Sequence, residues 1–418
     1  MTNCKFYERR RIIELLNSFF LCYYKSMKIG INASFARKSN TGIGQVTLNF
    51  LKKLSEFPIS YLSDKQANFQ FPNNFQISDF KNNGEKLEFV LYLEEDLSKD
   101  INFNLGKNFT KNVFLPKYKR DDLIRKIWWE KFCLPRRVKK DKCDVFISLY
   151  QCPTIFSKNI KHTMVVHDIV PKLFPEYLNN WRKKIYWKLT ERAIKKADKI
   201  IAISEHTKKD LIKYLQISEN KISVRYFDVA AIYKKEVSEN ELQRILKKYN
   251  LEKGYIYSGG GLEKRKNIDT LIYAYRKLLE KNKNIPFLVI SGKLMPELSP
   301  LIVDVEKLVK ELKLESKVKL LDFIPQKDLP ALYKNSCMFI FPSRYEGFGM
   351  PPLEAMNQGV PVIMAKNSSL PEVGGNAVKY FNSENSKELA KKIKEILNNE
   401  GLRNELSQKG KEQAKFFS

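Results

Sequence analysis

The sequence predicts an α/β protein made of two similar halves, each a parallel sheet covered by helices. From Met27 onward, short apolar segments alternate with longer amphipathic ones, which is the pattern of strands joined by helical crossovers. This alternation stops between about Asp228 and Lys253, where a charged helical stretch stands, and then resumes. With 418 residues the chain is long enough for two to three domains. We therefore expect an extension outside the fold at 1–26, a first domain at 27–230, a linker at 231–252 and a second domain at 253–418.

The expected elements follow from apolar runs and helix-start signals. A basic helix is expected from Arg120 to Arg137, and another is expected to start from the capping-box spacing of Thr207 and Asp210. The polar stretch 55–85 is expected to be a long irregular connection. Strands of the first half are expected at KIGIN (28–32), FVLYL (89–93), CDVFISL (143–149), TMVVHD (163–168) and KIIAIS (199–204). Strands of the second half are expected at YIYSGGG (255–261), FLVISG (287–292), KVKLLDF (317–323), MFIFPS (338–343) and PVIMA (361–365).

The charge of the chain is strongly basic. Its 75 Lys and Arg residues against 47 Asp and Glu residues give a net charge of +28, which attracts anions such as nucleic acid, acidic phospholipid or phosphorylated small molecules. Because most of the cations are lysines scattered singly along helices, and no nucleic-acid-binding motif is present, nucleic acid is not an expected partner. The six cysteines contain no CxxC pair and are expected to be reduced thiols. The apolar run Ile12–Tyr24 is too short to span a bilayer.

Residues 339–365 carry the most informative local pattern. A buried strand leads into a glycine-containing loop, and then Pro351 and Pro352 stand where the first turn of a helix tolerates missing amides. Gly359 is placed to end that helix. The helix start favours an anionic ligand, while Glu346 and Glu354 can accept hydrogen bonds from hydroxyl groups. The combination indicates a phosphorylated ligand that also carries a sugar or ribose.

The segment EGFGMPPLE at 346–354 resembles the signature of retaining GT-B glycosyltransferases of family 4, and it is mannosyltransferase-like. The resemblance implies two Rossmann-like domains whose parallel sheets face a central cleft. It also extends to SLPEVGGNAVKYF at 369–381 and to the segment around Ile324, which would face the nucleotide base. It implies that Glu346 orients the donor sugar and that Glu354 binds the ribose. The donor-binding residues implied in these segments are Ile324, Gly347, Phe348, Gly349 and Glu354.

The stretch SGGGLEKRKN from Ser258 resembles the opening of the second domain in the same family. The resemblance places Arg265 and Lys266 near the donor diphosphate, where fixed cations stabilise the negative charge that develops on the leaving group. No metal or other cofactor is then required. Many relatives carry another arginine where this chain has Gly260, which leaves more of the phosphate binding to Lys266.

Two segments of the first domain also resemble family motifs. TGIG at 41–44 resembles the glycine loop, in which Gly42 and Gly44 would bring backbone amides close to the donor. HDIVPKLFPEYL at 167–178 resembles the His-Asp motif and implies that His167, with Glu346, has a catalytic role in contact with the transferred sugar. Asp168 is either part of this site or the cap of a following turn. The other two histidines, at 162 and 206, are expected to be structural.

The function that the resemblance implies is retaining transfer of a hexose from a nucleotide diphosphate sugar, with GDP-mannose as the first expectation. The acceptor would be a glycan or a lipid-linked sugar in surface polysaccharide or lipopolysaccharide synthesis. The enzyme would work in the cytoplasm, with peripheral contact to an anionic membrane explaining the basic surface. Two alternatives stay open: another nucleotide-sugar GT-B enzyme such as an epimerase, and a non-catalytic protein that binds nucleic acid through its charge.

Overall fold

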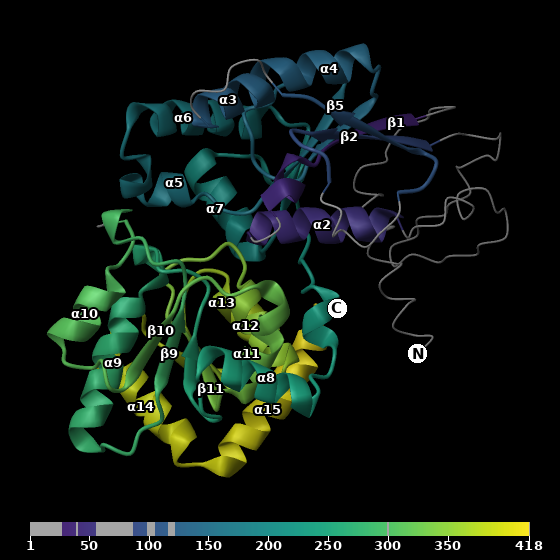
Figure 1. Cartoon of the computed structure of the whole chain (residues 1–418). Helices are drawn as coiled ribbons and strands as arrows, with labels where there is room; N and C mark the ends of the chain where they lie inside the picture. The colour runs from purple at the N-terminus through teal and green to yellow at the C-terminus, as the bar shows by residue number, and fades with distance from the viewer. Residues whose placement is uncertain are drawn as a thin grey trace. The chain divides into compact units, whose positions relative to one another are not determined.

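The computed structural model describes residues 27–38, 41–55, 87–97, 105–115, 122–298 and 301–417 (Figure 1). The extension expected at 1–26 and nearly all of the connection expected at 55–85 lie outside these residues. The chain divides into two compact units. The first unit extends to His167 and adds Leu178–Ala202 and Leu211–Arg225. The second unit comprises Asp168–Tyr177, Ile203–Asp210 and Tyr226–Ser418.

The first unit contains a seven-stranded sheet in the order β3-β2-β1-β4-β5-β6-β7, and every neighbouring pair is parallel. The central strands are apolar and buried on both faces, as expected for a parallel sheet covered by helices. The strands are β1 (Met27–Asn32), β2 (Leu87–Leu93), β3 (Phe109–Val113), β4 (Val145–Ser148), β5 (Lys161–Val166), β6 (Lys199–Ala202) and β7 (Ile222–Val224). The helices are η1 (Ser34–Lys38), α2 (Gly42–Ser55), α3 (Asp122–Trp128), η4 (Trp129–Cys133), α4 (Leu134–Lys140), α6 (Trp181–Lys196) and η6 (Glu219–Lys221).

The basic helix expected from Arg120 to Arg137 is not one regular α-helix. Its middle, η4, is a π-helical turn in which the Leu134 amide donates to the Trp129 carbonyl, five residues back. The cause is Pro135, which has no amide hydrogen to donate to Lys131 and whose ring crowds that carbonyl. The turn that precedes the proline therefore widens.

The helix expected to begin at Thr207 begins earlier. Helix α7 spans Glu205–Leu215, and the Ser204 hydroxyl accepts a hydrogen bond from the Thr207 amide at 2.9 Å. Serine is a preferred residue before a first helical turn because its oxygen satisfies an amide that has no partner within the helix. The capping-box assignment was wrong because Ser204 occupies that position.

The second unit contains a six-stranded parallel sheet in the order β10-β9-β8-β11-β12-β13. All five strands expected in this half are present, and a short sixth strand, β13, follows them. The strands are β8 (Ile256–Ser258), β9 (Leu288–Ser291), β10 (Val318–Leu321), β11 (Met338–Phe341), β12 (Val362–Ala365) and β13 (Lys379–Phe381).

Helices lie on both sides of this second sheet, with α9, α10 and α14 on one side and α8, α11, α12 and α15 on the other (Figure 1). The α-helices of its long segment, Tyr226–Ser418, are α8 (Glu239–Tyr249), α9 (Ile268–Lys281), α10 (Val305–Glu311), α11 (Leu329–Asn335), α12 (Met350–Asn357), α13 (Leu370–Gly374), α14 (Ser386–Leu397) and α15 (Glu400–Lys415). The shorter turns of this unit and of its N-terminal segment are α5 (Val170–Leu173), η5 (Pro175–Leu178), η7 (Ala231–Lys234), η8 (Lys264–Lys266), η9 (Pro296–Leu298) and η10 (Gln326–Asp328).

None of the helices in the described ranges is both long and apolar enough to cross a membrane. The four cysteines within those ranges, Cys133, Cys143, Cys152 and Cys337, form no disulfide.

The stretch expected as a linker, 231–252, folds as η7 and α8, and α8 packs against α11. One fully buried carboxylate, Asp328, fastens it there. Asp328 accepts hydrogen bonds from Arg244 at 2.7 Å, from Lys248 and from Tyr249 at 2.7 Å. Burial alone would raise the pKa of Asp328, but the hydrogen bonds from Lys248, Tyr249 and Arg244 lower it to about 2.

We predict that Asp328→Ala lowers the free energy of unfolding by about 1–3 kcal/mol, because a buried hydrogen-bonded carboxylate is lost while Arg244 and Lys248 can turn to solvent. Urea unfolding followed by circular dichroism measures this change. Glu311→Ala, which removes an exposed carboxylate from α10, is the control and should change the free energy by about 0.5 kcal/mol or less. Equal effects of the two substitutions would contradict the anchoring role of Asp328.

Candidate functional site

Three of the predicted site residues, Arg265, Lys266 and Glu346, lie at the switch point of the second sheet. Strands β8 and β11 are neighbours, yet the chain continues from β8 toward β9 and β10 on one side and from β11 toward β12 and β13 on the other. In such sheets, ligands bind beyond the carboxyl ends of the strands at the point where the strand order reverses. The segment after β8 carries Arg265 and Lys266, and the loop after β11 carries Glu346.

These two segments are joined by hydrogen bonds to backbone carbonyls. The Arg344 amide donates to the Arg265 carbonyl at 2.7 Å, and the Ser343 hydroxyl donates to the same carbonyl at 3.1 Å. The side chain of Asn267 donates to the Pro342 carbonyl at 2.9 Å. The side chains that project from the two segments are therefore held at fixed positions.

The centre of the site is a buried ionic cluster around Glu346. Its Oε1 lies 2.7 Å from Lys266 Nζ and 3.1 Å from Arg265 Nη1, and it accepts a hydrogen bond from the Ser343 hydroxyl at 2.7 Å. Burial opposes ionisation of Glu346, but the charges of Lys266 and Arg265 lower its pKa to about 2. Burial also lowers the pKa of Lys266, an effect that Glu346 counteracts. The cluster thus holds two cations and one carboxylate in an environment nearly free of water.

Arg265 is held from several sides. Its Nη1 donates to the Tyr345 carbonyl at 3.0 Å, and its Nε lies 2.8 Å from a carboxylate oxygen of Glu263. The Tyr177 hydroxyl donates to that same oxygen at 3.1 Å. Burial acts to lower the pKa of Arg265, but Glu346 and Glu263 raise it overall. The guanidinium is therefore charged and oriented before any ligand arrives.

Gly260 stands where the family resemblance leads us to expect a further arginine. Its φ is +107°, and a Cβ placed on it would lie 3.2 Å from both Phe341 and Pro351. A side chain here would be strained whatever the space around it. The backbone conformation at this position therefore favours glycine and disfavours arginine.

The loop residues Gly347, Phe348 and Gly349 connect Glu346 to α12. The Gly347 carbonyl accepts hydrogen bonds from the hydroxyls of Ser204 at 2.7 Å and Thr207 at 3.2 Å, and the Ser369 hydroxyl donates to the Phe348 carbonyl. Helix α12 begins at Met350 with Pro351 and Pro352 in its first turn, and Gly359 follows its end with a φ of +70°. The expected helix start and stop are confirmed.

The second glutamate of the signature, Glu354, has different surroundings from those of Glu346. It lies within α12 and accepts a hydrogen bond from the Tyr333 hydroxyl at 3.0 Å. Burial raises its pKa to about 7, although the hydroxyls of Tyr333 and Tyr233 act in the opposite direction. Ile324, the residue expected at the nucleotide base, follows β10 and is buried.

One expectation for the first domain, the glycine loop at 41–44, needs revision. Gly42 and Gly44 lie in the first turn of α2, not in a loop before it, and the Gly44 amide donates to the Thr41 hydroxyl at 3.1 Å. A Cβ on Gly44 would come within 1.9 Å of the Lys38 carbonyl oxygen, so close backbone approach requires this glycine. Asp168 accepts a hydrogen bond from the Val170 amide at 3.0 Å, as expected of a residue that caps a turn.

The three histidines have distinct partners. His167 is buried, and its Nε2 lies 2.9 Å from the Leu149 carbonyl, so this nitrogen carries the proton. His162 Nε2 lies 2.8 Å from the Ser148 hydroxyl, and burial lowers the pKa of His162 to about 4. His206 Nε2 lies 3.3 Å from Asp210. His162 and His206 therefore have the structural contacts that the sequence analysis expects of them.

Sequence reasoning missed three side chains that contact the predicted site residues. Ser343 contacts Glu346, Glu263 contacts Arg265, and Tyr333 contacts Glu354. Of these three, only Ser343 could have been predicted from the sequence, because it stands two residues after the central strand β11, where ligands bind in such sheets. Glu263 stands next to a basic triplet, where an acidic residue has no distinctive spacing.

The chain is similar to known glycosyltransferases in sequence and in fold. Residues 239–413 match the glycosyl transferases group 1 family, and residues 97–226 match glycosyltransferase family 4. The serotype-specific mannosyltransferase WbdA of Escherichia coli is 34% identical over 266 residues, which are 62% of this chain and 32% of WbdA. The O-antigen chain mannosyltransferase B of Escherichia coli is 32% identical over 254 residues, which are 60% of this chain and 65% of that protein. A glycosyltransferase from Rickettsia africae has a similar structure, with a TM-score of 0.62, 16% sequence identity and 94% of both chains covered.

The chain belongs to the group 1 glycosyltransferases of family 4, and its two parallel α/β sheets have the GT-B fold. Its relatives named above are mannosyltransferases, and one of them acts on the O-antigen chain. The matched stretch spans about a third of the length of WbdA and just under two thirds of the second relative.

The raised pKa of Glu354 predicts a pH-dependent stability. Between its usual value near 4.5 and about 7, the folded state binds more protons at this site than the unfolded state does, so the contribution of Glu354 to stability falls as pH rises through this interval. Glutamine does not titrate. The melting temperature of Glu354→Gln relative to wild type should therefore rise with pH over this interval and level off above it.

Thermal unfolding without nucleotide, at several pH values, measures this difference. Glu306→Gln, at an exposed position of α10, is the control and should give a curve parallel to that of wild type. A parallel curve for Glu354→Gln as well would show that Glu354 is ionised throughout and would contradict the prediction.

Proposed function

We propose that this protein is a retaining mannosyltransferase that uses GDP-mannose and extends a glycan or lipid-linked acceptor in surface polysaccharide synthesis. The observation that carries the proposal is the buried cluster of Glu346, Lys266 and Arg265 at the switch point of the second sheet. The names of the two Escherichia coli relatives support mannose as the sugar and the O-antigen type of polysaccharide as the product.

In this proposal Lys266 and Arg265 bind the diphosphate of the donor. The bond between the sugar and the diphosphate breaks in the transition state, and negative charge then grows on the leaving oxygen. Cations that are already fixed stabilise this charge without a reorganisation cost. The hydrogen bonds that hold Arg265 before ligand binding support this role.

Glu346 would then have two tasks. It keeps the two buried cations from repelling each other in the empty site, and it accepts hydroxyl hydrogen bonds from the sugar once phosphate takes over the cations. Glu354 would accept the ribose hydroxyls, with Ile324 against the base and the segment Gly347–Gly349 along the sugar and phosphates. His167, Gly42 and Gly44 are proposed to contact the donor, and Asp168 to hold the turn after His167.

Retention would follow from departure and attack on the same face of the sugar. The leaving diphosphate takes the proton of the acceptor hydroxyl, the acceptor oxygen bonds to the anomeric carbon, and the bond to the diphosphate oxygen breaks. The proposal requires no covalent nucleophile on the protein. It places the enzyme in the cytoplasm, at the surface of the membrane that carries the acceptor.

We predict that GDP stabilises the protein and that UDP and ADP do so less. A nucleotide present at 100 times its dissociation constant adds about 2.7 kcal/mol to the stability of the native state. Lys266→Ala should lose most of this stabilisation, because the variant lacks one of two phosphate-binding cations. Differential scanning fluorimetry with each nucleotide measures both effects, and radiolabelled GDP-mannose then tests transfer.

The matched control is Lys264→Ala, which removes a neighbouring but exposed lysine from the same turn. It should keep the full response to GDP. An unchanged melting temperature of the wild type with all three nucleotides would contradict a donor site in this unit. Preferential stabilisation by UDP would retain the site and refute GDP-mannose as the donor.

A further inference from the structure

Helix α6 presents an apolar and basic side to solvent. Trp181 is 62% exposed and Ile185 is 44% exposed, and both are large hydrophobic side chains without cover. Lys188, Arg192 and Lys195 continue the same side of the helix at spacings of three and four residues, and all three are exposed. Glu191 is the single acidic residue of this helix, and it pairs with Lys195.

A second apolar and basic group lies on α3, η4 and α4. Trp128 is 50% exposed, and its ring lies 5.0 Å from that of Phe132. The Lys131 ammonium and the Arg136 guanidinium lie over the Phe132 ring, at 5.2 Å and 5.9 Å from its centre. The group thus combines an exposed tryptophan and a partly buried phenylalanine with two cations.

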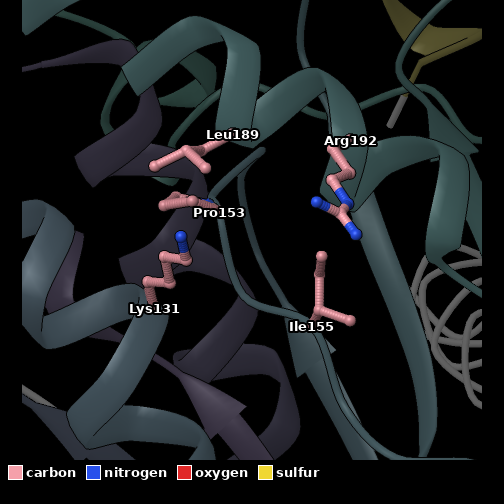
Figure 2. Close-up of a pocket in the computed structure, with 5 residues that line it drawn as sticks. All are labelled: Lys131, Pro153, Ile155, Leu189 and Arg192. Atoms are coloured by element: carbon pink, nitrogen blue, oxygen red, sulfur yellow. The ribbon is translucent and has the colours of Figure 1, made fainter. Parts of the chain in front are cut away.

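A cavity of about 240 Å³ joins the two groups. It is lined by Lys131, Pro153, Ile155, Leu189 and Arg192 (Figure 2). Figure 2 shows Lys131 on the same side of this space as Pro153 and Leu189, and Arg192 on the opposite side with Ile155. A cavity with cations at its sides and an apolar lining suits an amphiphilic anion.

Buried hydrogen bonds fix the two helical segments relative to each other. The Tyr186 hydroxyl of α6 donates to Glu130 of η4 at 2.9 Å, and the Tyr150 hydroxyl donates to the other carboxylate oxygen at 2.5 Å. Glu130 is fully buried, and its partners leave both oxygens satisfied. The π-helical turn that carries Glu130 also carries Lys131, so the cation at the cavity is placed by the same contacts.

The cations of this surface are available to an external anion. Lys131, Arg136, Lys188 and Arg192 form no ion pair with any residue that the structure describes. Phosphate groups of acidic lipids attract such cations, while tryptophan and aliphatic side chains partition into the interface between headgroups and acyl chains. Nucleic acid would match the charge but offers no acyl region for Ile155 and Ile185.

We propose that this surface, which we call the basic-aromatic face (Trp128, Lys131, Phe132, Arg136, Ile155, Trp181, Ile185, Lys188 and Arg192), docks on the surface of an anionic lipid membrane. The cavity between Lys131 and Arg192 receives a lipid phosphate. This inference deepens the proposed function and rests on it for the lipid-borne acceptor. Docking by the first unit would bring the enzyme to the surface at which such an acceptor is held.

The test is co-sedimentation of the full chain with vesicles of phosphatidylglycerol and phosphatidylcholine, and with vesicles of phosphatidylcholine alone, at rising salt. The wild type should bind the anionic vesicles, and binding should weaken as salt screens the charges. The double variant Lys131→Gln/Arg192→Gln should bind about 30-fold more weakly, since each cation near an anionic surface contributes about 1 kcal/mol. Trp181→Ser/Ile185→Ser should weaken binding at all salt concentrations.

Matched controls come from the second unit. Lys391→Gln/Lys394→Gln removes the same charge from an exposed side of α14, and Tyr273→Ser/Phe287→Ser removes two side chains that are each 44% exposed. Both controls should bind vesicles as the wild type does. Stabilisation by GDP, measured on every variant, confirms folding and reports separately on the donor site.

If the wild type responds to GDP but does not bind anionic vesicles, docking is refuted and the proposed function still stands. If the wild type binds vesicles but does not respond to any nucleotide, the proposed donor site is refuted and membrane docking still stands. Absence of binding to anionic vesicles at low salt, or equal binding by the face variants and the wild type, would overturn the inference. The inference would also be overturned if the wild type bound a single-stranded RNA oligonucleotide more tightly than anionic vesicles and the face variants lost that RNA binding.

Discussion

The contact between Glu346 and the two cations before α9 is the interaction on which the donor-side geometry depends. Two positive charges, Arg265 and Lys266, stand next to each other in a nearly dry environment, where each would otherwise destabilise the other. The carboxylate at 2.7 Å and 3.1 Å offsets this repulsion. Because it comes from the loop after β11 and the cations come from the segment after β8, the ion pair also joins the two strands that flank the switch point.

The two glutamates of the signature segment are chemically unlike each other. The pKa of Glu346 is lowered to about 2, because two cations lie next to it, whereas that of Glu354 is raised to about 7, because burial outweighs the opposing effect of the Tyr333 and Tyr233 hydroxyls. Environments that give two carboxylates such different pKa values often indicate separate roles. These surroundings fit the roles that we propose, in which Glu346 stays ionised beside the two cations and contacts the sugar, while Glu354 accepts the ribose hydroxyls.

Much of the fold follows from the sequence, because parallel strands buried on both faces give continuous apolar runs that local pattern detects. Arg265, Lys266 and Glu346 were also predictable, since each stands in a short motif directly after a strand. Glu263, Tyr333 and Tyr233 were not. Glu263 is close to Arg265 in the chain but has no distinctive spacing, whereas Tyr333 and Tyr233 act on Glu354 from about 20 and about 120 residues away, and a lone hydroxyl carries no spacing signal. The π-helical turn was missed because periodicity does not register one proline in an otherwise helical pattern.

The most direct test of the account compares GDP affinity with mannose transfer in Glu346→Gln. Glutamine keeps a hydrogen-bond acceptor but removes the charge, so Lys266 and Arg265 are left for the phosphates alone. Isothermal titration calorimetry should find that GDP binds as tightly as to the wild type or more tightly. Transfer from GDP-mannose should fall by a factor of about 100 or more, because the sugar and the cations are no longer oriented for the transition state. Loss of GDP binding in a folded variant, or transfer at the wild-type rate, would contradict the central role of this carboxylate.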